Sequence, residues 1–105
     1  MTAFRGTYTV LITPMTADGK HVDVPALKKL VDWQIEEGIH GLIPLGSTGE
    51  FLSLTAEERQ LVIETCVSTA AKRVPVLTGT GAEWTDGCVR LSREAETMGA
   101  DGVMI

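Results

Sequence analysis

The sequence has no long apolar run and no cluster of basic residues. Its apolar stretches fall well short of the roughly 18 consecutive residues of a membrane-spanning helix, and its first residues lack the apolar core of a signal peptide. The 105 residues include 9 Lys and Arg against 14 Asp and Glu, for a formal net charge of −5. Because binding to phosphate backbones depends on clustered Lys and Arg, we expect neither nucleic acid nor a membrane as a partner.

Cysteine and histidine are also scarce, with 2 of each. Cys66 and Cys88 fall in segments with helical periodicity and show no CxxC or metal-ligand spacing. His21 and His40 lack a second ligand at suitable spacing, so we expect no metal site and predict that both are solvent-facing or locally bonded. Since disulfides are rare in the cytosol, we expect both cysteines to be buried thiols of a cytoplasmic protein.

What the sequence does contain is a regular alternation of strand-like and helix-like segments. Strands are predicted over residues 7–12, from Gly41, over residues 74–78 and from Gly102. Between them, helices are predicted from an Asp23 cap to Gly38, over residues 56–71, and from a Thr85 cap to Gly99. The second helix opens on a Thr55-Ala56-Glu57-Glu58 capping box and ends beside Lys72 and Arg73, which suit the negative end of its dipole. Its inward residues are expected to be Leu61, Val62, Thr65, Cys66 and Ala70.

The alternation has a period of about 30 residues and predicts an α/β fold with a parallel sheet. Repeated βα units form either an open doubly wound sheet or a closed eight-unit barrel of roughly 250 residues. Residues 1–105 would supply about three and a half units of one domain. Because the last residues, 103–105, are an uncapped apolar strand, we expect a fragment of a longer protein. The alternative is a complete small domain that hides this edge by self-association.

The stretch around which the chain is organised is Gly41-Leu42-Ile43-Pro44-Leu45-Gly46-Ser47-Thr48-Gly49-Glu50. Two hydroxyl residues stand between glycines where a buried parallel strand runs out into a loop, which is where α/β proteins bind ligands. Hydroxyls and backbone N–H groups on such a turn suit a carboxylate or another small oxyanion. In the alternative interpretation the hydroxyls only close a tight turn.

Three further features bear on function. Glu50 is interpreted as an acid that bonds loop N–H groups near a helix N-terminus, with a general base as the alternative. Gly79-Thr80-Gly81 invites a dinucleotide fingerprint, but the position of its third glycine is occupied by Trp84. The loop at Gly46 lacks the spacing and the lysine of a P-loop. We therefore expect no nucleotide and no cofactor.

Taken together, these motifs resemble the N-terminal part of the dihydrodipicolinate synthase / N-acetylneuraminate lyase family. The resemblance covers essentially the whole chain, in the family's order. It is carried by Thr13-Pro14-Met15, Asp18-Gly19, Val22-Asp23, Gly41 with Gly46-Ser47-Thr48-Gly49-Glu50, and Pro75-Val76 with Gly79-Thr80-Gly81.

The resemblance implies the N-terminal half of a (β/α)8 TIM barrel and a Schiff-base (class I) lyase or aldolase of 2-oxo acids such as pyruvate, commonly a homotetramer. It implies that Ser47 and Thr48 receive the carboxylate of the 2-oxo acid, with Gly46, Gly49 and Glu50 as the supporting loop. In the synthase branch Ser47 would also join a proton relay with tyrosines.

One departure limits this expectation. The family's Schiff-base lysine and principal tyrosine lie on later strands, beyond Ile105. The lysines present are in a predicted turn or on predicted helices: Lys20, Lys28, Lys29 and Lys72. We therefore expect this chain alone to be inactive. A small anion-binding module and a self-associating half-barrel remain the alternatives.

Overall fold

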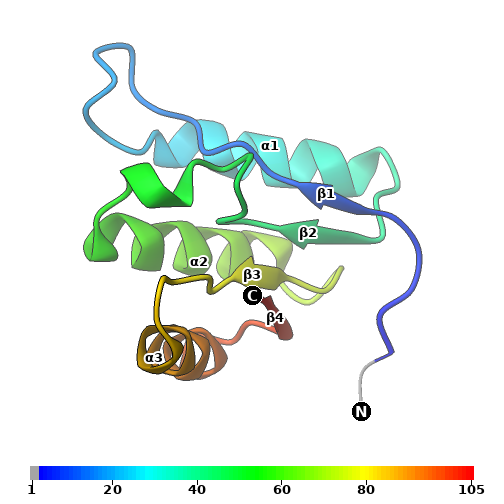
Figure 1. The fold of residues 1–105 in the computed structure, drawn as a ribbon. Coiled ribbons are helices and arrows are strands. Elements are labelled where there is room, and N and C mark those ends of the chain that lie inside the picture. The colour runs from blue at the N-terminus through cyan, green and yellow to red at the C-terminus, as the bar shows by residue number, and fades with distance from the viewer. Residues whose placement is uncertain (1–2) are drawn as a thin grey trace.

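The computed structural model describes residues 3–105 as alternating strands and helices (Figure 1). Within them no helix combines the length and apolarity needed to cross a bilayer. The elements in chain order are β1 (Tyr8–Val10), α1 (Val24–Glu36), β2 (Gly41–Ile43), the 3-10 turn η1 (Phe51–Ser53), α2 (Ala56–Ala70), β3 (Leu77–Gly79), α3 (Thr85–Thr97) and β4 (Gly102–Met104).

The four strands run parallel and lie side by side in chain order. β1 pairs with β2, with Tyr8 opposite Gly41, and β3 pairs with β4, with Leu77 opposite Gly102. The two pairs are joined between β2 and β3 by a parallel bridge from Leu42 to Val76. Figure 1 shows the strands in front of α1 and α2, with α3 beside β3 and β4. The predicted α/β class is confirmed.

Two strands differ in extent from their predictions. β1 is shorter, although the Leu11 N–H still donates to the Ile43 carbonyl at 3.0 Å. β3 begins and ends later than predicted, so that Gly79 is its last residue and not part of the exit loop. β3 begins late because of Pro75, which has no N–H to donate to a neighbouring strand. Pro75 takes part only through its carbonyl, which accepts from the Leu42 N–H at 3.0 Å.

The caps predicted for α1 and α2 are present. The Asp23 carboxylate accepts from the Ala26 N–H at 3.0 Å, and Gly38 follows α1 with a φ of +93°. At α2, the Glu58 N–H donates to the Thr55 hydroxyl at 3.1 Å and the Thr55 N–H donates to the Glu58 carboxylate at 2.9 Å. Both helices therefore begin where the sequence predicts.

The C-terminal end of α2 is held by one of its two predicted basic residues. The Arg73 guanidinium donates to the Thr69 carbonyl at 2.8 Å and to the Ala70 carbonyl at 3.1 Å, and it pairs with Asp32 of α1 at 2.6 Å. Lys72 instead adopts a left-handed φ of 62° in the turn that follows. Arg73 thus joins α2 to α1 as well as closing the helix.

Leu61 was predicted to face inward, and this is wrong. Its side chain is 37% exposed, whereas the other four residues predicted inward are buried. At 3.6 residues per turn, Leu61 falls outside the buried stripe that Val62, Ile63 and Cys66 form. Of the two cysteines, Cys66 is buried, and burial raises the pKa of its thiol to about 12. Cys88 is a free thiol but only half-buried, because α3 lies at the edge of the molecule.

The predicted Thr85 cap of α3 is also wrong. Trp84 occupies the N-cap position without a side-chain hydrogen bond, and Thr85 is the first helical residue. Gly87 makes this possible, since a Cβ at position 87 would come within 2.7 Å of the Trp84 ring. The indole of Trp84 therefore packs across the first turn of α3, and the same residue occupies the N-cap position of that helix.

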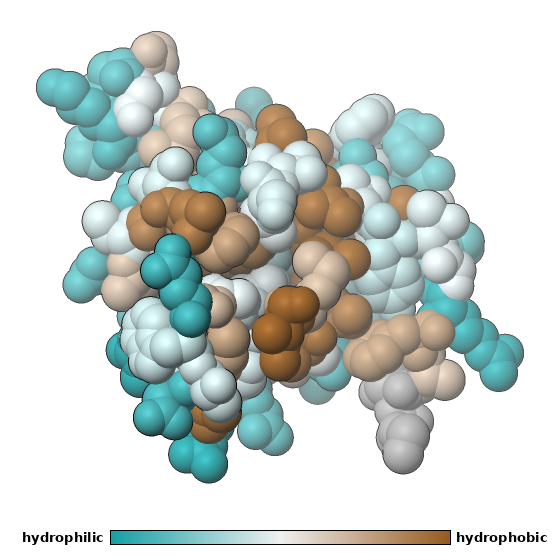
Figure 2. Space-filling view, viewed as in Figure 1, coloured by the Kyte–Doolittle hydropathy of each residue, from teal (hydrophilic) through white to brown (hydrophobic). Residues whose placement is uncertain are grey.

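The core fills the space between one face of the sheet and the helices. It includes Leu11, Leu27, Val31, Leu42, Val62, Cys66 and Val76. The other face of the sheet carries apolar side chains that remain exposed, such as Val10, Ile12 and Met104. Figure 2, viewed from the strand side, shows apolar residues across the middle of this face.

Candidate functional site

The candidate site is the loop of residues 44–50, which leaves the carboxyl end of β2. Leu45 turns the chain with a left-handed φ of 62°. The Gly49 N–H then donates to the Gly46 carbonyl, and the Glu50 N–H donates to the Ser47 carbonyl, each at 3.0 Å. These two backbone bonds close the turn at whose tip Ser47 and Thr48 lie.

The two hydroxyl side chains at the tip are exposed. Among residues 3–105 neither hydroxyl is hydrogen-bonded to another protein group. Backbone hydrogen bonds close the turn. The alternative interpretation, in which the two hydroxyls close it, is therefore wrong. The hydroxyls of Ser47 and Thr48 are therefore free of protein partners within the described residues.

The glycines of the loop allow it to lie close against its neighbours. A Cβ at Gly46 would come to 3.0 Å from Val10 Cγ1, and a Cβ at Gly49 to 3.0 Å from the Leu11 carbonyl oxygen. On the other side, a Cβ at Gly79 would overlap the Leu45 carbonyl. The loop is thus set between the exits of β1 and β3.

Glu50 ends the loop in a left-handed conformation with a φ of 56°. It occupies the N-cap position of η1, yet its carboxylate makes no capping hydrogen bond. The expectation that this carboxylate bonds loop N–H groups is therefore wrong. Its exposed position lets the carboxylate reach solvent, while its backbone holds the turn.

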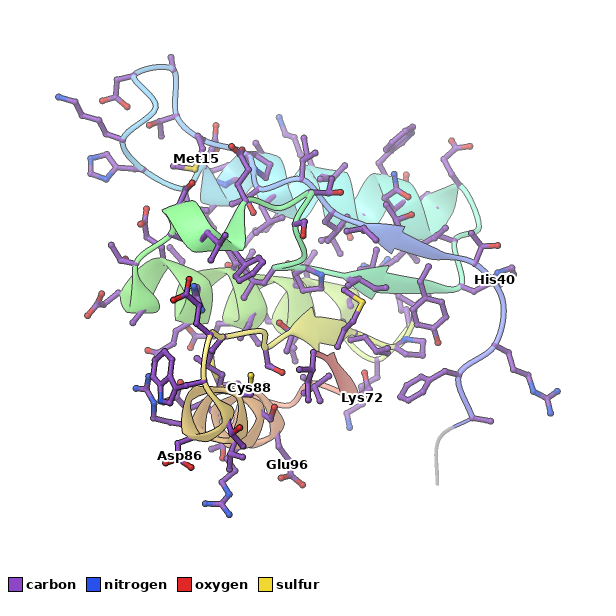
Figure 3. The ribbon with its side chains drawn as sticks, viewed as in Figure 1. Met15, His40, Lys72, Asp86, Cys88 and Glu96 are labelled. Atoms are coloured by element: carbon purple, nitrogen blue, oxygen red, sulfur yellow. The ribbon has the colours of Figure 1, made fainter. Side chains whose placement is uncertain are left out.

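His40 and Lys72 lie away from the loop. His40 precedes β2 and Lys72 follows α2, so both belong to the amino-terminal rim of the strands, opposite the end where the chain passes Met15 (Figure 3). His40 is exposed, and its Nδ1 accepts from the Thr7 N–H at 2.8 Å, as expected for a locally bonded histidine. Lys20, Lys28 and Lys29 lie in a turn and on α1. Lys20 lies on the carboxyl-terminal side of β1, in the exposed turn between Met15 and Val22. None of the four lysines belongs to one of the strands β1 to β4.

A hollow of about 410 Å³ opens beside the loop, between η1, α2 and the segment that joins β3 to α3. Leu45, Gly79 and Thr80 line its floor, but Ser47 and Thr48 do not line it. Within residues 3–105 no group of three His, Cys, Asp or Glu side chains is placed to hold a metal ion. The candidate site is therefore an open rim of hydroxyls and backbone that faces solvent.

Sequence reasoning missed one residue of this rim. The sequence places Thr13 directly after the first predicted strand, in the Thr13-Pro14-Met15 motif, and assigns it no role in the loop, but its buried hydroxyl donates to the Gly49 carbonyl at 2.7 Å. The local signal was present: a hydroxyl before Pro14, at the end of the strand adjacent to β2. Only the pairing of β1 with β2 shows which backbone group that hydroxyl meets.

Comparison with known proteins gives a consistent result. A model described as "Dihydrodipicolinate synthetase family" matches residues 3–105. The 4-hydroxy-tetrahydrodipicolinate synthase of Acidiphilium cryptum is 44% identical over 102 residues, which are 97% of this chain and 35% of that enzyme. That of Parvibaculum lavamentivorans is 48% identical over 101 residues, 96% of this chain and 34% of that enzyme. The chain thus spans about a third of the length of these curated relatives.

Solved structures match equally well. The dihydrodipicolinate synthase of Acinetobacter baumannii, solved in complex with pyruvate, has a TM-score of 0.93 and 39% identity over 96% of this chain and 34% of its own. YagE, a prophage protein of E. coli K12 from the dihydrodipicolinic acid synthase family, also in complex with pyruvate, has a TM-score of 0.89 and 40% identity over 97% of this chain and 34% of its own.

Proposed function

This chain belongs to the dihydrodipicolinate synthetase family, and from that premise we propose that it is the N-terminal part of a lyase that forms a Schiff base with pyruvate or a related 2-oxo acid. In such chemistry a lysine forms an imine with the ketone, and the imine accepts electrons as a C–C bond is made or broken. The pyruvate complexes of two similar structures support a 2-oxo acid as the substrate class.

In this proposal the Ser47–Thr48 loop receives the carboxylate of the 2-oxo acid. The observation that carries it is the pair of exposed hydroxyls at the carboxyl end of β2, on a turn closed by its own backbone. Thr48 contacts the carboxylate, and Ser47 passes protons in a relay with tyrosines beyond Ile105. Gly46, Gly49 and Glu50 form the supporting backbone of the loop.

The rest of the machinery lies outside this chain in our proposal. Four parallel strands in chain order are half of the strands of a (β/α)8 barrel, and the relatives are about three times as long. The Schiff-base lysine then belongs to a later strand, because none of the four lysines present lies on one of the strands β1 to β4. The 105-residue chain by itself is inactive, and the whole protein is a cytoplasmic homotetramer that needs no cofactor.

Borohydride trapping tests the proposed chemistry. The complete open reading frame that contains this chain is incubated with pyruvate and borohydride, and its mass is measured. We expect a pyruvate-sized gain, mapped to a lysine beyond Ile105, and no gain on the 105-residue chain. Absence of any gain on the complete protein would reject the Schiff-base mechanism. A gain on the 105-residue chain would reject its inactivity.

The same samples distinguish the proposed lyase from the alternative, an anion-binding module that catalyses no reaction. If the complete protein binds pyruvate, as followed by calorimetry, but is never trapped by borohydride, the loop holds a carboxylate without imine formation. Trapping together with binding supports the lyase.

A further inference from the structure

We propose that Thr13 is a positioning residue for the Ser47–Thr48 loop, so that the affinity of the loop for a carboxylate depends on a hydroxyl of the neighbouring strand. This inference rests on the function proposed above for the loop. It assigns to Thr13 no contact with substrate. Its action passes through the backbone of Gly49.

The contact that carries the inference is a short hydrogen bond between distant parts of the chain. The Thr13 hydroxyl donates to the Gly49 carbonyl at 2.7 Å, across 36 residues of sequence, and the Thr13 side chain is only 7% exposed. A buried bond of this length between two strand exits has no competing water and a well-defined geometry.

Gly49 is the residue through which the tip of the loop is fixed. It follows Thr48 directly, and its N–H donates to the Gly46 carbonyl at 3.0 Å. The Gly49 carbonyl accepts the hydrogen bond from Thr13, so both the N–H and the carbonyl of Gly49 are hydrogen-bonded. Thr48 is therefore attached to a backbone whose position is set by β1 on one side and by its own turn on the other.

Close packing makes this anchoring specific. A Cβ at position 49 would lie 3.0 Å from the Leu11 carbonyl oxygen and 3.3 Å from the Thr13 hydroxyl. The loop therefore touches the exit of β1 with backbone against backbone. Binding groups must be held within about 0.5 Å of the productive geometry. We therefore expect the loss of this anchor to displace the Thr48 hydroxyl and to weaken carboxylate binding.

The segment that carries Thr13 is itself held firmly. The Leu11 N–H donates to the Ile43 carbonyl at 3.0 Å, which continues the β1–β2 ladder, and the Asp23 N–H donates to the Pro14 carbonyl at 2.8 Å. Asp23 caps α1. Thr13 thus connects the loop to a strand and a helix that do not belong to the βα unit of the loop.

The test compares Thr13→Val, which keeps the shape and removes the hydroxyl, with Thr13→Ser, which keeps the hydroxyl. Thr9→Val is the matched control, because Thr9 lies on β1 and its hydroxyl donates to the Gln34 side chain at 2.7 Å, away from the loop. All variants are made in the complete open reading frame. Should Thr13→Val not fold, Thr13→Ala provides a second variant without the hydroxyl.

Two readouts are measured. We expect Thr13→Val to raise the KM for pyruvate about fivefold to tenfold, with kcat changed much less, as for one lost hydrogen bond. Hydrogen exchange at the amides of Gly49 and Glu50 should be faster than in the wild type by a similar factor, because the loop opens locally more often. Thr13→Ser and Thr9→Val should stay within about twofold of the wild type in both readouts.

The outcomes separate this inference from the proposed function. If the amides of the loop exchange in Thr13→Val as in the wild type, Thr13 does not position the loop. If they exchange faster but KM is unchanged, the loop is held by Thr13 without consequence for the ligand, and the inference fails at its second step. If the wild-type protein is not trapped by borohydride, the proposed function fails, while the exchange data still decide whether Thr13 anchors the loop.

Discussion

Thr78 has a buried hydroxyl that finds no hydrogen-bond partner within residues 3–105, although its side chain has no exposed surface. Burying an unpaired hydroxyl costs free energy, and a methyl group of the same shape avoids that cost. We expect Thr78→Val to raise the free energy of unfolding by about 1 kcal/mol, measured by urea denaturation.

Thr80→Val serves as the control for Thr78→Val, since the Thr80 hydroxyl is hydrogen-bonded to Ser92 at 2.9 Å and its loss leaves Ser92 unpaired. That variant should lower the free energy of unfolding by about 1 kcal/mol. Equal destabilisation by both variants would mean that the Thr78 hydroxyl is satisfied in solution.

Thr48 is the residue on which the proposed carboxylate site depends most directly. We expect Thr48→Val to weaken pyruvate binding to the complete protein by about 0.5–3 kcal/mol, the range for a lost hydrogen bond that includes bonds to charged groups. Titration calorimetry measures the difference. Thr97→Val, on the exposed face of α3, is the control, because its hydroxyl bonds only the Arg93 carbonyl, at 3.0 Å. Identical titrations of wild type and Thr48→Val would remove Thr48 from the site.

At the scale of elements, the turn between β1 and α1 is closed by backbone hydrogen bonds between Thr16 and His21 and between Gly19 and Thr16, and the Asp18 carboxylate adds two more bonds. The Thr16 hydroxyl donates to Asp18 at 2.6 Å and the Lys20 N–H donates to it at 3.0 Å. These two bonds hold the pKa of the Asp18 carboxyl below its ordinary value of 3.8, and the bond from Thr16 has the larger effect. Because the pKa is lower in the folded turn, the carboxylate stabilises the turn above pH 3.8, and this stabilisation is lost as the pH falls through the folded pKa.

We therefore expect the amide resonances of residues 16–21 to shift toward their disordered values only below pH 3.8, with Asp18 itself titrating below that point. A carbon-detected NMR titration follows the Asp18 carboxyl, and amide spectra recorded at the same pH values follow residues 16–21. Thr16→Val should move the midpoint up toward the ordinary value, because it removes the largest cause of the shift. A wild-type midpoint at or above 3.8 would show that the turn is not held in this way.

How far the sequence predicts an element depends on whether its determinants are local. The caps at Asp23 and at Thr55 with Glu58 were predictable, because every atom involved lies within one turn of helix. The N-terminus of α3 was not, since it depends on how the Trp84 ring packs over Gly87. The bounds of β3 follow its pairing with β4, in which Leu77 lies opposite Gly102 and Gly79 opposite Met104, and no local pattern encodes this pairing.

The same distinction applies to the candidate site. Its position at the carboxyl end of β2 follows from the glycines and hydroxyls of one decapeptide. The anchor at Thr13 comes from 36 residues away and needed the β1–β2 pairing. The side chains that would complete a Schiff-base site cannot be predicted from these residues, because none of the lysines lies on one of the strands β1 to β4.

At the scale of the whole molecule, the sheet has one covered and one open face. Side chains alternate along β1 and its exit: Leu11 is in the core, whereas Ile12 is 58% exposed. Near Gly46 the side chains of Val10 and Met104 approach from β1 and β4 on this same open face. In the proposed barrel the open face becomes the interior, packed by layers of side chains from the remaining strands.

This asymmetry predicts the behaviour of the 105-residue chain in isolation. Within residues 3–105 the outer edges of β1 and β4 pair with no further strand, and Ile105, which follows β4, is 83% exposed. An exposed apolar face beside such edges favours association with other copies. We expect the isolated chain to bind a hydrophobic dye and to sediment as concentration-dependent oligomers. Ile12→Lys should reduce both effects by placing a charge on the open face. Leu61→Lys, which places the same charge on the outer side of α2, should leave both unchanged. A compact monomer that binds no dye would show that the open face is covered within the chain itself, and the argument for a missing half of the barrel would lose its structural support.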